Sequence, residues 1–218
     1  MKFKAVIFDL DGTLLDTIGD IADAVNGVLA ARDFPTHDVD TYKRIIGAGI
    51  EDLISCALPE ERRDEETMKA CLHDVYEVYS KSRHDKTRPY EGIEELLDEL
   101  VRRGIKIAVL SNKPHASAVR QIMQYFPRHS FERVEGAKEN RALKPLPDVA
   151  HEIMDDMGVR PQECIMVGDV EMDILVAKNA GMYSVGVSWG FRHPEELIAC
   201  GAKKIIYGPL QLLELFEQ

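Results

Sequence analysis

The chain has 218 residues, of which 45% are hydrophobic and 30% are charged, and its formal net charge is -11. This hydrophobic fraction excludes an intrinsically disordered chain, and the acidic balance argues against nucleic acid as a partner, because phosphate backbones attract Lys and Arg. No apolar run approaches the ~20 residues that span a bilayer, so we expect no membrane partner and a cytoplasmic location.

The four cysteines are scattered along the chain and form no C-x-x-C pair, which is typical of reduced thiols in the cytoplasm. The seven histidines show no zinc-binding spacing. The sequence leaves open whether the protein is a monomer or a homodimer.

The first predicted element is a buried strand over Ala5–Leu10, which runs into the motif DLDGT. The stretch from about residue 18 to residue 86 then carries helical patterns and no convincing strand. Helices are expected over Ile18–Ala31, Ile50–Leu58 and Glu65–Ser82. This stretch is too long for a loop, and we interpret it as a helical cap inserted after the first strand.

Strand and helix patterns alternate in the rest of the chain. Short apolar runs predict strands over Lys106–Leu110, Phe131–Val134, Cys164–Val167, Tyr183–Val187 and Lys203–Tyr207. Amphipathic patterns predict helices over Gly92–Arg103, His115–Phe126 and Ala150–Met157. Continuous apolar strands that alternate with helices are typical of a doubly wound parallel α/β sheet. We therefore predict an α/β core over residues 1–16 and 87–218, with an all-helical cap subdomain over residues 17–86.

Two aspartates follow the first strand. Side chains two residues apart point the same way in an extended chain, so the carboxylates of Asp9 and Asp11 are expected to converge. Ligands of doubly wound sheets bind beyond the carboxyl ends of the strands. Two carboxylates gathered there repel each other unless a cation lies between them, and Mg²⁺ prefers oxygen ligands. An Asp-Gly pair is also an ordinary turn signal, so this motif alone leaves both interpretations open.

Polar residues that suit a phosphate group appear later in the chain. Ser111 and Asn112 follow the second predicted core strand, where a hydroxyl and an amide could donate to phosphate oxygens. Lys144 stands just before a predicted helix and could neutralise a phosphate as a point charge. Taken singly, each is more typical of an ordinary loop or a solvated surface than of a phosphate site.

A second pair of acids follows the strand over Cys164–Val167. Asp169 lies at the strand end, and Asp173 follows four residues later, which places both on one face if a helical turn starts there. Asp169 could then share a metal ion with Asp9, while Asp173 orients its neighbours. A helix-capping aspartate beside an exposed acid is the alternative.

The four signals together resemble the haloacid dehalogenase-like phosphohydrolases. The motif D-x-D-G-T after an apolar strand, a later Ser-Asn, a Lys and then G-D-x-x-x-D occur in the order of that family's signature. The resemblance covers essentially the whole chain, and it is greatest to phosphoglycolate phosphatase-like members. Five stretches carry it: DLDGTLLDT, RPYEGIEELLDEL, SNKP, LKPLPDVA and VGDVEMDILVAKNAGM. It implies a Rossmann-like core with a helical cap.

The resemblance also implies a role for each motif residue. Asp9 would be the nucleophile that forms an aspartyl-phosphate, and Asp11 would be the general acid and base. Mg²⁺ would be held by Asp9, Asp169 and the main-chain carbonyl of Asp11. Ser111, Asn112 and Lys144 would bind the phosphate, with Asp173 supporting the metal site or Lys144.

The expected function is Mg²⁺-dependent hydrolysis of a small phosphorylated metabolite, with 2-phosphoglycolate as the leading substrate. A β-phosphoglucomutase-like mutase, a pyrophosphatase or a nucleotidase of the same family are alternatives, and a non-catalytic binding protein is a further one. Gly47 and Gly49 in the cap would let main chain approach the substrate, although a plain helix–helix turn explains them equally well. Further substrate-contact candidates are Tyr42, Arg44 and Arg192.

Overall fold

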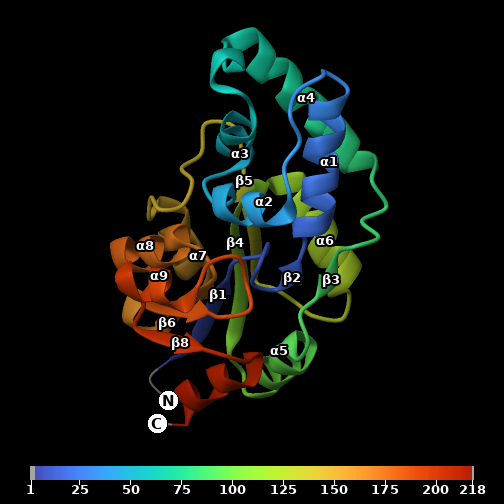
Figure 1. The fold of residues 1–218 in the computed structure, drawn as a ribbon. Coiled ribbons are helices and arrows are strands. Elements are labelled where there is room, and N and C mark those ends of the chain that lie inside the picture. The colour runs from blue at the N-terminus through green and yellow to red at the C-terminus, as the bar shows by residue number, and fades with distance from the viewer. Residues whose placement is uncertain (1–2, 218) are drawn as a thin grey trace.

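The computed structural model describes residues 3–217. Its core is a six-stranded sheet in the order β5-β4-β1-β6-β7-β8 (Figure 1), in which every neighbouring pair is parallel. The strands are β1 (Ala5–Phe8), β4 (Lys106–Pro114), β5 (Arg133–Ala137), β6 (Cys164–Gly168), β7 (Tyr183–Val187) and β8 (Lys204–Ile206). The predicted doubly wound parallel α/β sheet is confirmed.

Side chains of β1 alternate between two apolar layers, because successive residues of a strand face opposite sides of the sheet. Val6 and Phe8 belong to the layer that contains α5 (Ile93–Arg102) and α6 (His115–Tyr125). Ala5 and Ile7 belong to the other layer. That layer contains α7 (Asp148–Met157) and α8 (Glu171–Ala180). Burying each large apolar side chain contributes about 1.5–3 kcal/mol, so the central strand is fixed firmly from both faces.

Four helices are inserted between two short strands, β2 (Leu15–Asp16) and β3 (Arg88–Pro89). They are α1 (Ile18–Ala30), α2 (Val39–Ile45), α3 (Ile50–Ala57) and α4 (Glu65–Lys81). Figure 1 shows them grouped above one end of the sheet. Their apolar faces form a separate cluster, which Val170 and Phe191 of the core join. The all-helical insertion matches the expectation, and its division from the core at residues 17 and 86 stays a prediction.

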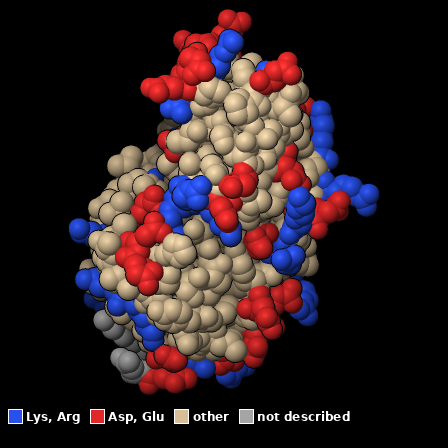
Figure 2. Space-filling view, in the orientation of Figure 1, with Lys and Arg blue, Asp and Glu red and all other residues tan. Residues whose placement is uncertain are grey.

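The remaining elements complete the core and the cap. They are α9 (Pro194–Ala199) and the short 3-10 helices η1 (Glu60–Arg62), η2 (Pro161–Glu163) and η3 (Pro209–Phe216). Within residues 3–217, no helix combines the length and the apolar character needed to cross a membrane. On the face drawn in Figure 2, Lys and Arg side chains are interspersed with Asp and Glu instead of forming one basic patch.

Several elements differ from the sequence-based expectation. Strands β2 and β3 form a two-residue antiparallel ladder, which is too short to produce a periodic pattern. Helix α2 has only seven residues and was likewise not expected. Strand β4 continues to Pro114 instead of ending at Leu110, because its pairing with β5 resumes at Pro114 and Ala137 after an irregularity. Ser111 and Asn112 therefore lie in the strand and not after it.

Candidate active site

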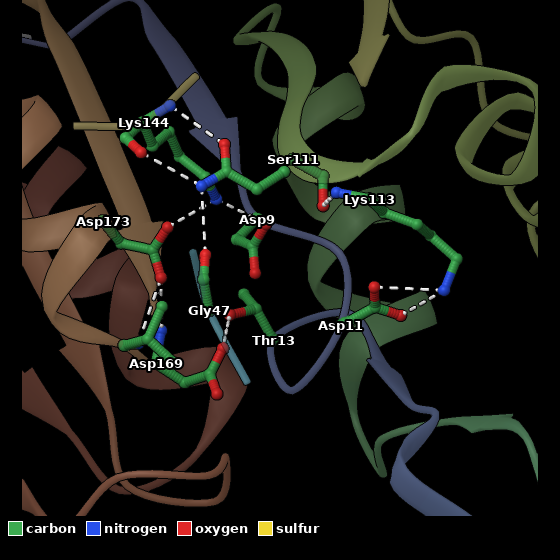
Figure 3. Close-up of polar contacts among 11 residues, drawn as sticks. Asp9, Asp11, Thr13, Gly47, Ser111, Lys113, Lys144, Asp169 and Asp173 are labelled. Atoms are coloured by element: carbon green, nitrogen blue, oxygen red, sulfur yellow. Dashed lines mark hydrogen bonds and ion pairs between the residues drawn. The ribbon is translucent and has the colours of Figure 1, made fainter. Parts of the chain in front are cut away.

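Three of the predicted site residues, Asp9, Ser111 and Asp169, come from the carboxyl ends of three adjacent strands (Figure 3). Asp9 directly follows β1, Asp169 directly follows β6, and Ser111 lies in the last residues of β4. Strand β1 lies between β4 and β6, and the chain adds strands first on one side of β1 and then on the other. This reversal is the position at which doubly wound sheets bind ligands.

Lys144 lies at the centre of this group. Its Nζ is 2.6 Å from Oδ1 of Asp9 and 2.7 Å from Oδ1 of Asp173, and its side chain is 2% exposed. The other oxygen of Asp173 accepts hydrogen bonds from the main-chain amides of Asp169 and Val170, both at 3.0 Å. Asp173 thus joins Lys144 to the first turn of α8 and holds the ammonium group against Asp9.

Three buried carboxylates lie close to one another at this position. Asp9, Asp169 and Asp173 each offer an oxygen atom, and these atoms lie within 4.8 Å of one another. Burial raises the pKa of Asp9 to about 7, and the charge of Asp173 adds to this effect although Lys144 opposes it. Burial and the charges of Asp9 and Asp173 also raise the pKa of Asp169. Lys144 pairs with two of these three acids, so the site holds excess negative charge, which suits a divalent cation.

Asp169 is held by partners on both of its carboxylate oxygens. The hydroxyl of Thr13 donates to Oδ1 at 2.7 Å, and the amide of Phe191 donates to Oδ2 at 2.9 Å. The indole of Trp189 in turn donates to the carbonyl of Thr13 at 3.0 Å. These bonds join the loop after β1 to the loop after β7 and fix the direction of the Asp169 side chain.

The Asp11 carboxylate lies outside this acidic group, which corrects the expectation that it converges with Asp9. The strand ends at Phe8, and the chain turns at Gly12, whose φ is +86°. The rule that side chains two residues apart point the same way therefore no longer applies at residue 11. The carboxylate instead faces Lys113, with Nζ 2.9 Å from Oδ1 and 3.1 Å from Oδ2 (Figure 3). Metal ligation by the main-chain carbonyl of Asp11 stays a prediction.

Lys113 was not singled out from the sequence, although a signal for it was present. The strand-like run continues past Leu110, and Ser111 and Lys113 stand two residues apart, as side chains on one face of a strand do. Ser111 and Lys113 both line the cavity beside Asp11, and the Ser111 hydroxyl oxygen accepts a 3.2 Å hydrogen bond from the Lys113 amide. Burial lowers the pKa of Lys113, but the charge of Asp11 and the contacts with Asp11 and Tyr79 together outweigh this effect and raise the pKa overall.

Asn112 lines the cavity, but its side-chain amide bonds to main chain. Its Nδ2 donates to the carbonyls of Gly47 and Lys144, both at 3.0 Å, and its Oδ1 accepts from the Lys144 amide at 2.9 Å. Both hydrogens of the Asn112 amide therefore already bond to main-chain carbonyls. This arrangement indicates a structural, bracing role for Asn112 instead of the predicted hydrogen bond to phosphate. Asn112 fastens the cap loop to the segment that carries Lys144.

The cavity lies between the core and the cap. Asp9, Asp11, Ser111 and Lys144 line its core side, and Gly47 and Gly49 line the cap side. The cap side is otherwise largely apolar, with Ile21, Ala24, Val25, Ile46, Ile50, Leu53 and Val75.

The three further substrate-contact candidates lie elsewhere. Tyr42 is fully buried and donates to Asn26, and Arg44 donates to Thr41 within α2. Arg192 donates to the carbonyls of Lys43 and Ile46 and pairs with Glu171. Arg192 therefore fixes the end of α2 and does not line the cavity.

Comparisons with known proteins agree with this geometry. Residues 6–187 match the family of haloacid dehalogenase-like hydrolases. The phosphoglycolate phosphatase of Psychrobacter arcticus is 31% identical over 204 residues, which cover 90% of this chain and 88% of that protein. The match thus extends over both the core and the helical insertion.

Two solved structures share the fold over almost their whole length. The first is a Lactobacillus delbrueckii subsp. bulgaricus protein provisionally described as a phosphoglycolate phosphatase. It has a TM-score of 0.90 and 31% identity, and the match covers 99% of this chain and 98% of that one. A predicted phosphatase from Clostridium acetobutylicum has a TM-score of 0.86 and 27% identity, with all of both chains covered. The chain belongs to the haloacid dehalogenase-like hydrolase family.

Proposed function

We propose that the protein is a Mg²⁺-dependent phosphatase that hydrolyses a small phosphomonoester, with 2-phosphoglycolate as the leading substrate. The observation that carries this proposal is the buried contact between Asp9 and Lys144 on the floor of a cavity, beside Asp169 and Asp173. The name of the Psychrobacter arcticus relative supports the choice of substrate.

Asp9 is the proposed nucleophile. Its carboxylate oxygen forms a bond to phosphorus while the ester P–O bond breaks, which yields an aspartyl-phosphate and an alkoxide. Asp11 enters this step as the protonated carboxylic acid and transfers its proton to that alkoxide, which leaves the Asp11 carboxylate. In the second half-reaction Asp11 takes a proton from water, which attacks phosphorus and releases inorganic phosphate, so that Asp9 is restored.

Lys144 and Ser111 are the proposed partners of the phosphoryl oxygens. Phosphoryl transfer spreads negative charge over these oxygens, and a fixed ammonium group and hydroxyl stabilise it without reorganising. Asp173 keeps Lys144 in position, since it accepts from Nζ and is itself held by two main-chain amides. Lys144 is thereby pre-oriented before the substrate arrives.

The donor set fits a magnesium ion. Asp9, Asp169 and the main-chain carbonyl of Asp11 would hold the ion, and oxygen ligands of this kind are those that Mg²⁺ prefers. When bound, the ion would reduce the repulsion between the Asp9 carboxylate and an incoming phosphate. The oxygens of Asp173 already accept from Lys144 and two amides, which favours a supporting role for this residue.

The cap supplies the other wall of the site. Main chain at Gly47 and Gly49 lines the cavity, and the apolar cap residues exclude water from the bound ester. The cavity between these walls is the proposed binding site of a small phosphorylated metabolite. A cytoplasmic location belongs to the same proposal, since the four cysteines are free thiols. Light scattering of the purified protein distinguishes a monomer from a homodimer.

The proposal is tested by measuring phosphate release from a panel of metabolite phosphoesters, with and without Mg²⁺. We expect release that depends on Mg²⁺ and is fastest with 2-phosphoglycolate, and we expect Asp9→Asn to abolish it. Phosphate release by Asp9→Asn at the wild-type rate would refute the nucleophile. Interconversion of hexose phosphates without phosphate release would identify a mutase instead.

A further inference from the structure

A polar contact from the cap reaches the proposed general acid through one core lysine. Nζ of Lys113 lies 2.9 Å and 3.1 Å from the two carboxylate oxygens of Asp11. The same nitrogen lies 2.9 Å from the hydroxyl oxygen of Tyr79, which is on cap helix α4. It also stands over the Tyr79 ring, 4.7 Å from the centroid. Lys113 therefore joins Asp11 to the cap.

Tyr79 is itself held in place by the core. Its hydroxyl oxygen accepts a second hydrogen bond from Nε2 of Gln121 on α6, at 3.0 Å. Its ring also meets the ring of His84, in the segment that follows α4, at a steep angle with centroids 4.6 Å apart. Lys113 and Gln121 thus both donate to the Tyr79 hydroxyl. Because Tyr79 lies at the end of α4 and Gln121 lies on α6, Tyr79 contacts Lys113 only while the end of α4 packs against α6.

Two further bonds fasten the same junction without touching Lys113. The guanidinium of Arg120 donates to the carbonyl of Ser80 at 2.9 Å, and the hydroxyl of Tyr125 donates to the carbonyl of His84 at 3.3 Å. The junction between cap and core can therefore be weakened at Tyr125 without removing a partner of Lys113. This provides a matched control.

Lys113 is buried, so the position of its ammonium group depends on its hydrogen-bond partners. Its side chain is 4% exposed, and a buried ammonium group is stable only where acceptors replace water. Asp11 supplies the opposite charge and Tyr79 supplies a neutral acceptor. Two acceptors fix the position of Nζ, and a fixed Nζ limits the directions in which the Asp11 carboxylate can point.

We infer that Lys113 and Tyr79 are positioning residues, which aim the Asp11 carboxylate at the leaving-group oxygen when the cap is seated. This inference rests on the proposed phosphatase function. Asp11 takes its working orientation from Lys113, and Lys113 takes its own from Tyr79. Protonation of the leaving group is thereby coupled to the closed arrangement in which the apolar cap excludes water.

The experiment compares aryl phosphates of similar size whose leaving groups differ in basicity. Phenyl phosphate expels a phenolate that needs a proton, whereas 4-nitrophenyl phosphate expels a weakly basic phenolate that needs little help. The ratio kcat/KM covers the steps up to the first irreversible one, the P–O cleavage, so the later role of Asp11 as a base does not enter. The wild type, Tyr79→Phe, Lys113→Met, Lys113→Arg and Tyr125→Phe are measured with Mg²⁺ present.

For Tyr79→Phe we expect kcat/KM to fall about 10-fold with phenyl phosphate and less than about 2-fold with 4-nitrophenyl phosphate. For Lys113→Met we expect about a 100-fold fall with phenyl phosphate, the lower end of what general acid catalysis contributes. Lys113→Arg keeps the charge and should recover part of this loss. Tyr125→Phe should leave the ratio between the two substrates unchanged.

Equal losses with both substrates in Tyr79→Phe would overturn the inference, since a general loosening of the fold would produce them. An unchanged ratio in both Tyr79→Phe and Lys113→Met would also overturn it. Thermal unfolding confirms that each variant is folded, and Tyr79→Phe removes only one oxygen atom. A wild-type protein that releases phosphate from no ester would overturn the proposed function itself.

Discussion

Gly12 lies against Asp169 so closely that a Cβ atom on residue 12 would be 2.1 Å from Oδ2 of Asp169. The φ of Gly12 is +86°, a conformation that residues with a side chain rarely adopt. The glycine of the D-x-D-G-T motif therefore serves two purposes, because it turns the chain after β1 and lets the loop approach the carboxylate group.

Gly12→Ala is expected to disrupt the site. The added methyl group must displace either the loop or the Asp169 carboxylate, and the backbone strain adds about 1–2 kcal/mol. We expect phosphatase activity to fall at least about 100-fold, since a displacement of about 1 Å at a reacting centre costs that much. Gly104→Ala is the control, since Gly104 also has a positive φ of +71°, but a Cβ atom there would meet no neighbouring group of residues 3–217 within 4 Å. It should lose stability and keep its activity.

Lys144→Met is expected to destabilise the protein and to inactivate it. Removing the ammonium group leaves Asp9 and Asp173 buried without a cation, and breaking a buried ion pair costs about 3–5 kcal/mol. Urea unfolding measures the change in the free energy of unfolding. Lys69→Met is the matched control, because the exposed pair of Lys69 with Glu65 should contribute less than about 0.5 kcal/mol. A loss in Lys144→Met no larger than the control's would contradict this prediction.

Asp9→Asn is expected to raise the thermal stability of the metal-free protein at pH 8. The pKa of Asp9 is raised in the folded protein to about 7, chiefly by burial, so ionising Asp9 is harder there than in the unfolded chain. The folded state therefore loses stability as the pH rises from about 4 to about 7, and the asparagine variant avoids this loss. We expect a Tm about 5 °C above that of the wild type at pH 8, and equal Tm values near pH 4.

The same Tm measurement at pH 8 is repeated with magnesium. Adding Mg²⁺ at pH 8 should raise the Tm of the wild type and leave that of Asp9→Asn almost unchanged, since the variant lacks one of the proposed oxygen ligands. Identical Tm values for the two proteins at pH 8 without metal would contradict the electrostatic argument.

Asn112→Ala is expected to detach the cap loop from the phosphate side of the cavity. The substitution leaves the carbonyl of Gly47 and the main-chain groups of Lys144 without partners, at a cost of about 1–3 kcal/mol for each buried group. We expect lower stability and a raised KM. Asn179→Ala is the control, because exposed Asn179 donates a single bond to the carbonyl of Pro145 and should contribute about 1 kcal/mol or less. A KM equal to the wild-type value would contradict the bracing role.

Much of the core was predictable because each strand is covered on both faces. Strands buried in this way read as short apolar runs, and the predicted run over Tyr183–Val187 coincides with β7. The acidic motifs were also predictable, since they directly follow such runs and parallel strands end at one edge of the sheet. Elements of two residues, such as β2 and β3, carry no periodicity and could not be found in this way.

The orientation of Asp11 was predicted wrongly, for a local reason. The alternation rule holds only within a strand, and the strand ends at Phe8. Three residues later, the direction of a side chain depends on the turn and on the nearest opposite charge. Here that charge is Lys113, which lies 102 positions away in the sequence.

The sequence by itself determined the family, the parallel sheet and the residues Asp9, Ser111, Lys144 and Asp169 as members of one site, because strand ends and motif order are local properties of the chain. Only the tertiary structure decided which charges face each other. It set Lys144 between Asp9 and Asp173, Asn112 between the cap loop and the core, and Lys113 between Asp11 and Tyr79. Such contacts join residues far apart in the chain, and they form only when the folding of the sheet and the packing of the cap on the core bring their elements together.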